Sequence, residues 1–256
     1  MWTRKLLKEN ALIAFKRNYW TCVFVAVIAG ILGASAPGAS FNLNWNSNTE
    51  AASEAGVLSA TSIPSYLIYV LGAAAMIAVV VGLAMSILLA NVVKIGCNRY
   101  FLENREHKTS AGQLFFGFRE GRYGSNVYIM FRKDLSVFLH ALLLLVPGII
   151  KAYQYFLVPY ILAENPDLNR EDVFELSKAM MKGNKRKLFV LELSFIGWAA
   201  VNTLTFGILG VFWLSPYIHA TIAEFYTAVK AEAFAKGIAS SVELPGVYYQ
   251  EQTVEC

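Results

Sequence analysis

A few polar side chains stand inside apolar stretches of this sequence, and these residues could bind or carry a polar ligand. They are Lys151, Gln154, Glu192, Asn202 and Glu224. A charge at the depth of a bilayer is costly and normally faces a partner or a water-filled cavity. Lys151, Gln154, Glu192 and Glu224 are therefore predicted as candidate binding residues. Alternatively, Glu192 and Glu224 lie near the cytoplasmic ends of their segments, where partial hydration costs little.

Lys151 is the one basic residue within the apolar stretch Leu135–Ala163. An unpaired ammonium group there would cost roughly 2.5–3.5 kcal/mol on membrane insertion. We expect a carboxylate to offset much of that cost. Glu192 is favoured over Glu224, because a helix that starts at the basic residue Lys187 brings Glu192 just inside the membrane. The alternative is that the lysine extends along apolar surface to reach a lipid phosphate.

Signatures of catalysis are absent from the sequence. It has no His-Glu-x-x-His, no Gly-x-Ser-x-Gly, no P-loop and no Gly-x-Gly-x-x-Gly. The three histidines are isolated, and His140 and His219 lie in apolar segments, where we expect hydrogen-bonded span residues rather than ligands. The three cysteines have no short spacing of the kind that disulfides or zinc require. The sequence therefore predicts a protein that is not an enzyme, with no cofactor and no metal.

The charges are few and unevenly distributed. Charged residues make up 16% of the chain, whereas a soluble domain has about 25%. No Lys or Arg occurs between Arg17 and Lys94, and a second gap runs from Lys187 to Lys230. Basic blocks between apolar segments mark the cytoplasmic side of a membrane protein. The net charge of +4 is modest, so we expect anionic lipid headgroups as partners and no nucleic acid, with Lys185, Arg186 and Lys187 contacting headgroups.

Four apolar segments are predicted to span the membrane, since a span needs roughly 20 residues. They are Trp20–Ala36, Ile63 to about Val93, Leu188–Val201 and Ile208–Val229. Before them, residues 1–19 form a basic cytoplasmic arm, either an interfacial helix or a frayed terminus. Residues 37–62 form an external loop, residues 94–134 and 164–187 are cytoplasmic segments, and residues 230–256 are a cytoplasmic tail.

The remaining apolar stretch, Leu135–Ala163, is interrupted by Pro147-Gly148 and decides the topology. If it crosses once, thirteen basic residues lie inside and eight lie outside. If it turns back at Pro147-Gly148, twenty-one lie inside and none outside, with Lys151 alone in the apolar region. The second arrangement obeys the positive-inside rule far better. We therefore expect a membrane hairpin, followed by a soluble helix at about Arg170–Lys182.

Small residues recur every fourth position in the first two predicted spans. One series is Cys22, Ala26, Gly30 and Ala34, and the other is Ala74, Ala78, Gly82, Ser86 and Ala90. Small side chains let helices approach closely in lipid. The two ridges are predicted to face each other.

The central block carries a family resemblance. Leu145–Tyr153, Pro159–Asp167, Leu176–Lys185 and Leu193–Trp198 together resemble the bacterial integral membrane family catalogued as domain of unknown function 975. The same block distantly resembles membrane domains linked to glycerophosphodiester phosphodiesterases, whose activity belongs to a separate soluble domain. The resemblance implies a fold and a bacterial cytoplasmic membrane, and no reaction.

Together these observations predict an all-α, polytopic membrane helix bundle formed by a single domain, residues 1–256. It has four full spans plus a Pro-Gly-broken hairpin, up to six membrane helices, with both termini cytoplasmic and the cell membrane as its location. The predicted function is non-catalytic contact with lipid or with a membrane-protein partner. The alternative is a small transporter or lipid-handling protein with a polar site near Pro147-Gly148. Water-filled access to Lys151 would favour the alternative.

Overall fold

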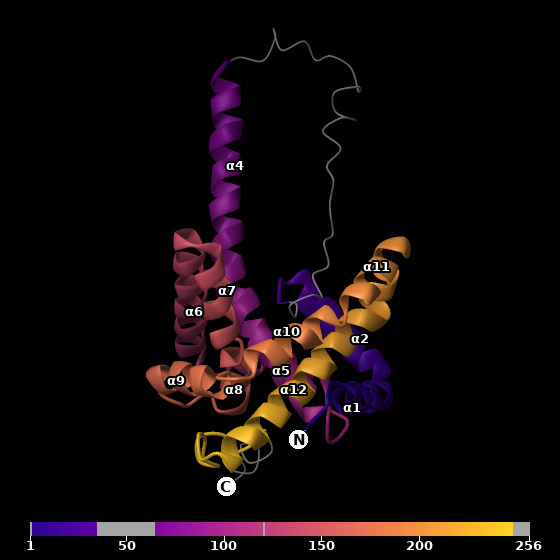
Figure 1. Cartoon of the computed structure of the whole chain (residues 1–256). Coiled ribbons are helices and arrows are strands. Elements are labelled where there is room, and N and C mark those ends of the chain that lie inside the picture. Colours follow the sequence, from indigo (N-terminus) through magenta and orange to yellow (C-terminus); the bar gives the residue numbers. More distant parts are fainter. Residues whose placement is uncertain (1, 35–64, 120, 248–256) are drawn as a thin grey trace.

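The computed structural model describes residues 2–34, 65–119 and 121–247, and within these ranges every regular element is helical (Figure 1). In chain order the elements are α1 (Arg4–Arg17), α2 (Tyr19–Ile31), α4 (Ser65–Met85), the π-helical turn η1 (Ser86–Ala90), α5 (Asn91–Glu103), the 3-10 helix η2 (Ala111–Phe118), α6 (Tyr123–Leu143), α7 (Leu145–Gln154), α8 (Val158–Glu164), α9 (Arg170–Met180), α10 (Lys185–Leu193), α11 (Ile196–Leu204), the π-helical turn η3 (Gly210–Leu214) and α12 (Ser215–Ala235). The predicted all-α class is confirmed for this part of the chain.

The basic arm is a helix and not a frayed end. Thr3 caps α1 by accepting a hydrogen bond from the backbone N–H of Leu6 at 3.3 Å. The buried face of α1 includes Leu7 and Ala11 and packs against α12. The chain then bends by 101° into α2. The arm is therefore tied into the protein core.

The two ends of the long rod α4–η1–α5 differ in their surroundings. In α4 the large apolar side chains are exposed around the helix, whereas nearly all of α5 is buried against α2, α8, α12 and η2. Close approach to η2 requires glycine, because a Cβ on Gly96 would lie 1.9 Å from the carbonyl oxygen of Leu114. The rod thus joins an exposed apolar end to a packed core.

The expected hairpin is present, but its turn is not where the sequence indicated. The chain reverses at Leu144, which is extended (φ −159°, ψ 138°), and not at Pro147-Gly148. Pro147 fits within the first turn of α7, where its missing N–H is harmless. Gly148 lies at the contact between the arms, since a Cβ there would be 2.5 Å from the Cα of Ala141. The Pro-Gly pair therefore marks the close packing of the hairpin rather than its reversal.

A second hairpin joins α11 to η3 and α12. Its turn lies at residues 205–207, inside the predicted turn Asn202–Gly207, with Phe206 (φ 51°) and Gly207 (φ 83°) in the left-handed region. The side chain of Asn202 holds the turn by accepting from the N–H of Gly210 at 2.5 Å. A helix, α9, is also present where one was expected, and Gly183 (φ 87°) follows it.

Two described stretches are long and apolar enough to cross a membrane, Leu145–Glu164 and Lys185–Leu204. The bent pair α1–α2 adds a third if it counts as one span. The prediction of four full spans plus a hairpin therefore exceeds what the described residues show. The α2 helix has 13 residues. Of the rest of the first predicted span, residues 32–34 are described and are not helical, and residues 35 and 36 lie outside the described ranges. Most of α12 is buried inside the protein.

The two small-residue ridges do not face each other. Cys22 and Ala26 are buried, but α2 packs against α5 and α12 rather than α4. A Cβ on Gly82 would meet no atom within 4 Å. Only at its lower end does the second series approach α2, where a Cβ on Gly33 would lie 3.7 Å from that of Ala90.

The free ends of the apolar elements share one direction in Figure 1. The start of α4, the α6–α7 tip and the end of α11 point toward the top of the view. The helices α1 and α9 and the end of α12 lie toward the bottom. This arrangement separates an apolar end of the molecule from an end formed by α1, α9 and the end of α12.

Candidate functional site

A cavity of about 440 Å³ lies between α5 and the helices α6, α7 and α8. Both arms of the α6–α7 hairpin line it, with Phe138 and Ala141 from α6 and Ala152 from α7. Phe156 and Pro159 continue this apolar lining toward α8. The volume falls within the range of about 300–1,000 Å³ typical of small-molecule sites. We call this cavity the hairpin pocket.

The other end of the hairpin pocket is polar. Asp134 accepts a hydrogen bond from Asn91 at 2.9 Å and forms an ion pair with Lys133 at 3.0 Å. Lys94 is half-buried on α5 and has no hydrogen bond or ion pair with any described residue. Asn98 is 2% exposed, and its Nδ2 has no hydrogen-bond partner among the described residues. The polar end thus holds two ammonium groups but one carboxylate, which is paired with Lys133, and the Nδ2 of Asn98 has no acceptor among the described residues.

Sequence reasoning pointed to this region through Lys151, but the expected ion pair is wrong. The Nζ of Lys151 donates to the hydroxyl of Tyr155 at 3.4 Å and lies 5.2 Å from the centre of its ring. Glu192 instead accepts a hydrogen bond from Tyr153. Tyr155 lines the hairpin pocket, so Lys151 is one side chain removed from it.

Glu224 belongs to a different cluster. Its two carboxylate oxygens accept from Nε and Nη2 of Arg105 at 2.7 and 3.2 Å. The Glu224 side chain is 7% exposed and that of Arg105 is 19% exposed. This bidentate pair joins α12 to the end of α5, so the carboxylate predicted for ligand binding is already neutralised within the protein.

Gln154 ends α7 beside α9. Its backbone carbonyl accepts from the hydroxyl of Ser177 at 2.9 Å. Its side-chain Oε1 is buried and has no partner among the described residues. The structure therefore gives Gln154 a contact between two helices, and it does not bring the residue together with Glu192 or Glu224.

The members of the basic run 185–187, which precedes the predicted span Leu188–Val201, differ in their contacts. Lys187 pairs with Glu232 at 3.2 Å and lies 5.0 Å from the ring centre of Trp2. Hydrogen bonds from Lys236 and Lys187 hold the pKa of the Glu232 carboxyl below its ordinary value. Arg186 is exposed, and Lys185 is half-buried. Arg186 and Lys185 form no ion pair with a described residue.

A buried network around Glu164 escaped sequence reasoning. Glu164 is 2% exposed and accepts from the hydroxyl of Tyr226 at 2.7 Å, the N–H of Gly246 at 2.6 Å and Nζ of Lys230. The signal in the sequence is a carboxylate directly after the apolar run 158–163. It does not reveal the partners, because they lie 62 to 82 residues away.

Arg99 anchors a second part of this core. Its guanidinium group donates to Glu103, to the carbonyl of Ala163 and to the carbonyl of Val247, each at 2.9 Å. It also stacks on the ring of Phe116, at 3.9 Å from the ring centre. A buried charge is tolerated when it is paired and hydrogen-bonded in this way. These contacts close the core beneath the hairpin pocket.

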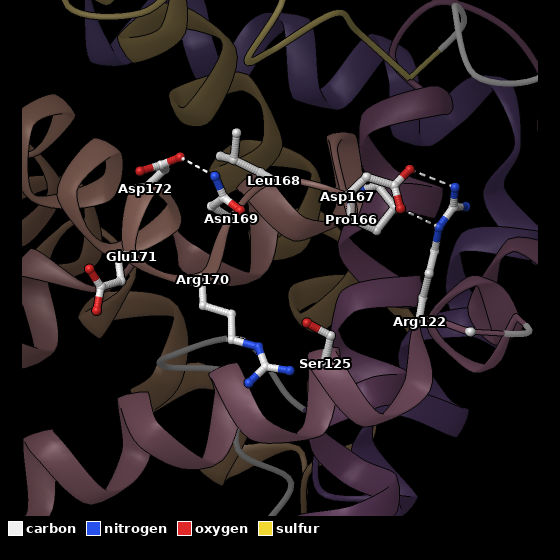
Figure 2. Close-up of a pocket in the computed structure, with 10 residues that line it drawn as sticks. Arg122, Ser125, Pro166, Asp167, Leu168, Asn169, Arg170, Glu171 and Asp172 are labelled. Atoms are coloured by element: carbon white, nitrogen blue, oxygen red, sulfur yellow. Dashed lines mark hydrogen bonds and ion pairs between the residues drawn. The ribbon is translucent and has the colours of Figure 1, made fainter.

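A larger cavity of about 600 Å³ lies between α6 and the start of α9 (Figure 2). Several of its side chains are paired with one another, whereas Glu171 forms no ion pair or hydrogen bond with a described residue. Arg122 forms two hydrogen bonds to Asp167 at 2.8 and 2.6 Å, and Asn169 donates to Asp172 at 3.1 Å. Arg170 lies over the ring of Tyr128. The paired residues join α9 to α6.

Acidic, histidine and cysteine side chains do not gather into a metal site in the described part of the chain, where no group of three or more of them lies close enough to hold an ion. His219 stacks on Phe101 at 5.1 Å between ring centres, and its Nδ1 lies 3.9 Å from the sulfur of Cys97. His219, which the sequence places in an apolar segment, thus lies in the packed core.

The family model for the protein of unknown function DUF975 matches residues 10–233. The chain belongs to this family, because the match covers most of its length. No curated protein and no solved structure matches the chain.

Proposed function

We propose that this member of the DUF975 family is a non-catalytic, multi-pass membrane protein that acts through contact with lipid. The observation that supports the proposal is the exposed apolar surface at the α6–α7 tip. There the exposed fraction of Leu142 is 77%, of Leu143 80% and of Leu145 71%. A contiguous apolar surface of this kind marks an interaction site in a folded protein.

The end of α11 supports the same view. Leu204 is 81% exposed and Phe206 is 97% exposed at the second hairpin turn. This turn points in the same direction as the α6–α7 tip in Figure 1. Transfer of one such side chain from water into hydrocarbon is favourable by about 1.5–3 kcal/mol. Both tips would thus stabilise insertion into one apolar phase.

The proposed orientation places both tips toward the outer side. The arm 1–19, the segments 94–134 and 164–187 and the tail 230–256 then lie in the cytoplasm, and the loop 37–62 lies outside. Glu164 at the end of α8 pairs with Lys230, and Glu224 on α12 pairs with Arg105. In Figure 1, α8 and the end of α12 lie toward the bottom. Basic residues therefore remain beside the anionic inner leaflet.

A lipid-handling protein is the second candidate, and the hairpin pocket favours it. The pocket is bordered by the same hairpin that carries the exposed apolar tip. A lipid could thus enter the pocket from the surrounding bilayer. A membrane-protein partner at the tips is the competing reading, and the depth of the tips distinguishes the two.

Quenching by brominated lipid tests the proposal. We would label Leu143→Cys and Phe206→Cys with an environment-sensitive bimane, in a Cys256→Ser background where Cys22 and Cys97 are buried. In vesicles with bromine at mid-chain, both labels should be quenched strongly. Lys178→Cys on the exposed face of α9 is the control and should be quenched weakly. Equal quenching at Leu143 and Lys178 would refute insertion of the hairpin tip.

A further inference from the structure

We propose that the hairpin pocket binds an amphiphile with one acyl chain and an anionic oxygen headgroup, either a carboxylate or a phosphate ester. The inference deepens the proposed lipid contact and rests on it. It names the class of lipid that the pocket takes and the residues that hold each part.

The polar end of the pocket has more donors than acceptors. Lys133 is neutralised by Asp134 at 3.0 Å, and Asp134 also accepts from Asn91. Lys94 is left without a carboxylate of its own among the described residues. With two ammonium groups and one carboxylate, the pocket carries one excess positive charge. A singly charged anion would neutralise it, whereas a cationic ligand would add to the excess.

Asn98 adds a second reason for an oxygen ligand. Its amide is buried at 2% exposure, and its Nδ2 has no partner in the described part of the chain. A buried donor that makes no hydrogen bond destabilises the folded state. A headgroup oxygen between Lys94 and Asn98 would satisfy this donor. Both residues lie on α5, one helical turn apart, so they present their polar groups to the same side.

The apolar end fits a hydrocarbon chain. From Lys133 to Ala141 the pocket follows two turns of α6, about 12 Å along the helix axis. Phe138 is 63% exposed on this path, and Ala141 and Ala152 are also exposed. The pocket is therefore open toward the side where the hairpin would meet the bilayer. One chain can lie along it, with its end continuing toward the tip.

Binding of laurate to the purified full chain in a neutral maltoside detergent tests the inference. Isothermal titration calorimetry should detect laurate, while dodecyltrimethylammonium, which has the same chain and the opposite charge, should bind at least tenfold more weakly. Dodecyl phosphate compares the phosphate headgroup with the carboxylate. Inorganic phosphate alone should bind at least tenfold more weakly than dodecyl phosphate, because it lacks the chain. Equal affinity for laurate and the cationic amphiphile would overturn the inference.

Two variants assign the binding to the pocket. Lys94→Gln should weaken laurate binding at least tenfold, and Lys178→Gln, the same change on the exposed face of α9, should alter it less than twofold. Val137→Phe puts a ring into the apolar lining and should also weaken binding tenfold. Val201→Phe on α11, outside the pocket, is its control. If Lys94→Gln and Val137→Phe both bind laurate as the parent does, the pocket is not the site.

The outcome is separable from that of the proposed function. Quenched labels at Leu143 together with no laurate binding would reject the ligand and keep the inserted hairpin. Laurate binding that depends on Lys94, together with unquenched labels at Leu143, would keep the pocket and reject the insertion. Each result therefore decides one of the two statements.

Discussion

At the scale of single residues, the pair of Arg105 and Glu224 is a structural contact within the core. Glu224→Gln should destabilise the protein by roughly 3–5 kcal/mol, because it leaves a largely buried guanidinium with only the exposed carboxylate of Glu106, 4.0 Å away. Thermal unfolding in detergent would measure the change. Glu175→Gln, on the exposed face of α9, should shift stability by no more than about 0.5 kcal/mol. Similar losses for both variants would show that the buried pair contributes nothing special.

The sequence identified unusual residues at this scale, but not their partners. Lys151, Glu192 and Glu224 stand out because they interrupt apolar stretches. Their contacts come from residues that the fold brings near, as with Arg105 and Glu224, which are 119 positions apart. Tyr153 competes successfully for Glu192 because it lies on the face of α7 toward α10 and donates a hydrogen bond. Charge complementarity alone therefore favoured the wrong pair.

At the scale of elements, the contact between the two hairpin arms depends on Gly148. Gly148→Ala would bring a Cβ to 2.5 Å from the Cα of Ala141, so the arms must separate. We expect a loss of about 1–3 kcal/mol, as for other overpacked sites, measured by thermal unfolding. Gly197→Ala is the matched control, since a Cβ there meets nothing within 4 Å. It should be neutral or stabilising by up to about 1 kcal/mol. An equal effect at both glycines would contradict the close contact.

The hairpin was predictable as an element, and its turn was not. Basic residues lie on both sides of Leu135–Ala163, so the positive-inside rule predicts that the chain turns back to the side from which it came. Hydropathy predicts the length of the two hairpin helices. The reversal lies at Leu144, three residues before Pro147, because proline is compatible with the start of a helix. The hairpin pocket was not predictable, since it depends on how four helices pack around Lys94 and Asn98.

At the scale of the whole molecule, the family and the helical class followed from the sequence, and the number of spans did not. The central block 147–198 carried the resemblance, and the family match covers residues 10–233. Hydropathy alone cannot tell an apolar helix in lipid from one inside a protein. For that reason the sequence predicts Ile208–Val229 as a span, although most side chains of α12 are buried, and α12 packs against α1, α2 and α5.

Topology reporters test the central claim most directly, which is that the chain returns through the hairpin and keeps its basic segments on one side. We would fuse a reporter that is active outside, or one that is active in the cytoplasm, after Glu50 and after Asn184, with a fusion after Lys236 as the control for the tail. The account predicts an external position after Glu50 and cytoplasmic positions after Asn184 and Lys236. An external position after Asn184 would mean that Leu135–Ala163 crosses the membrane once, and it would contradict the account.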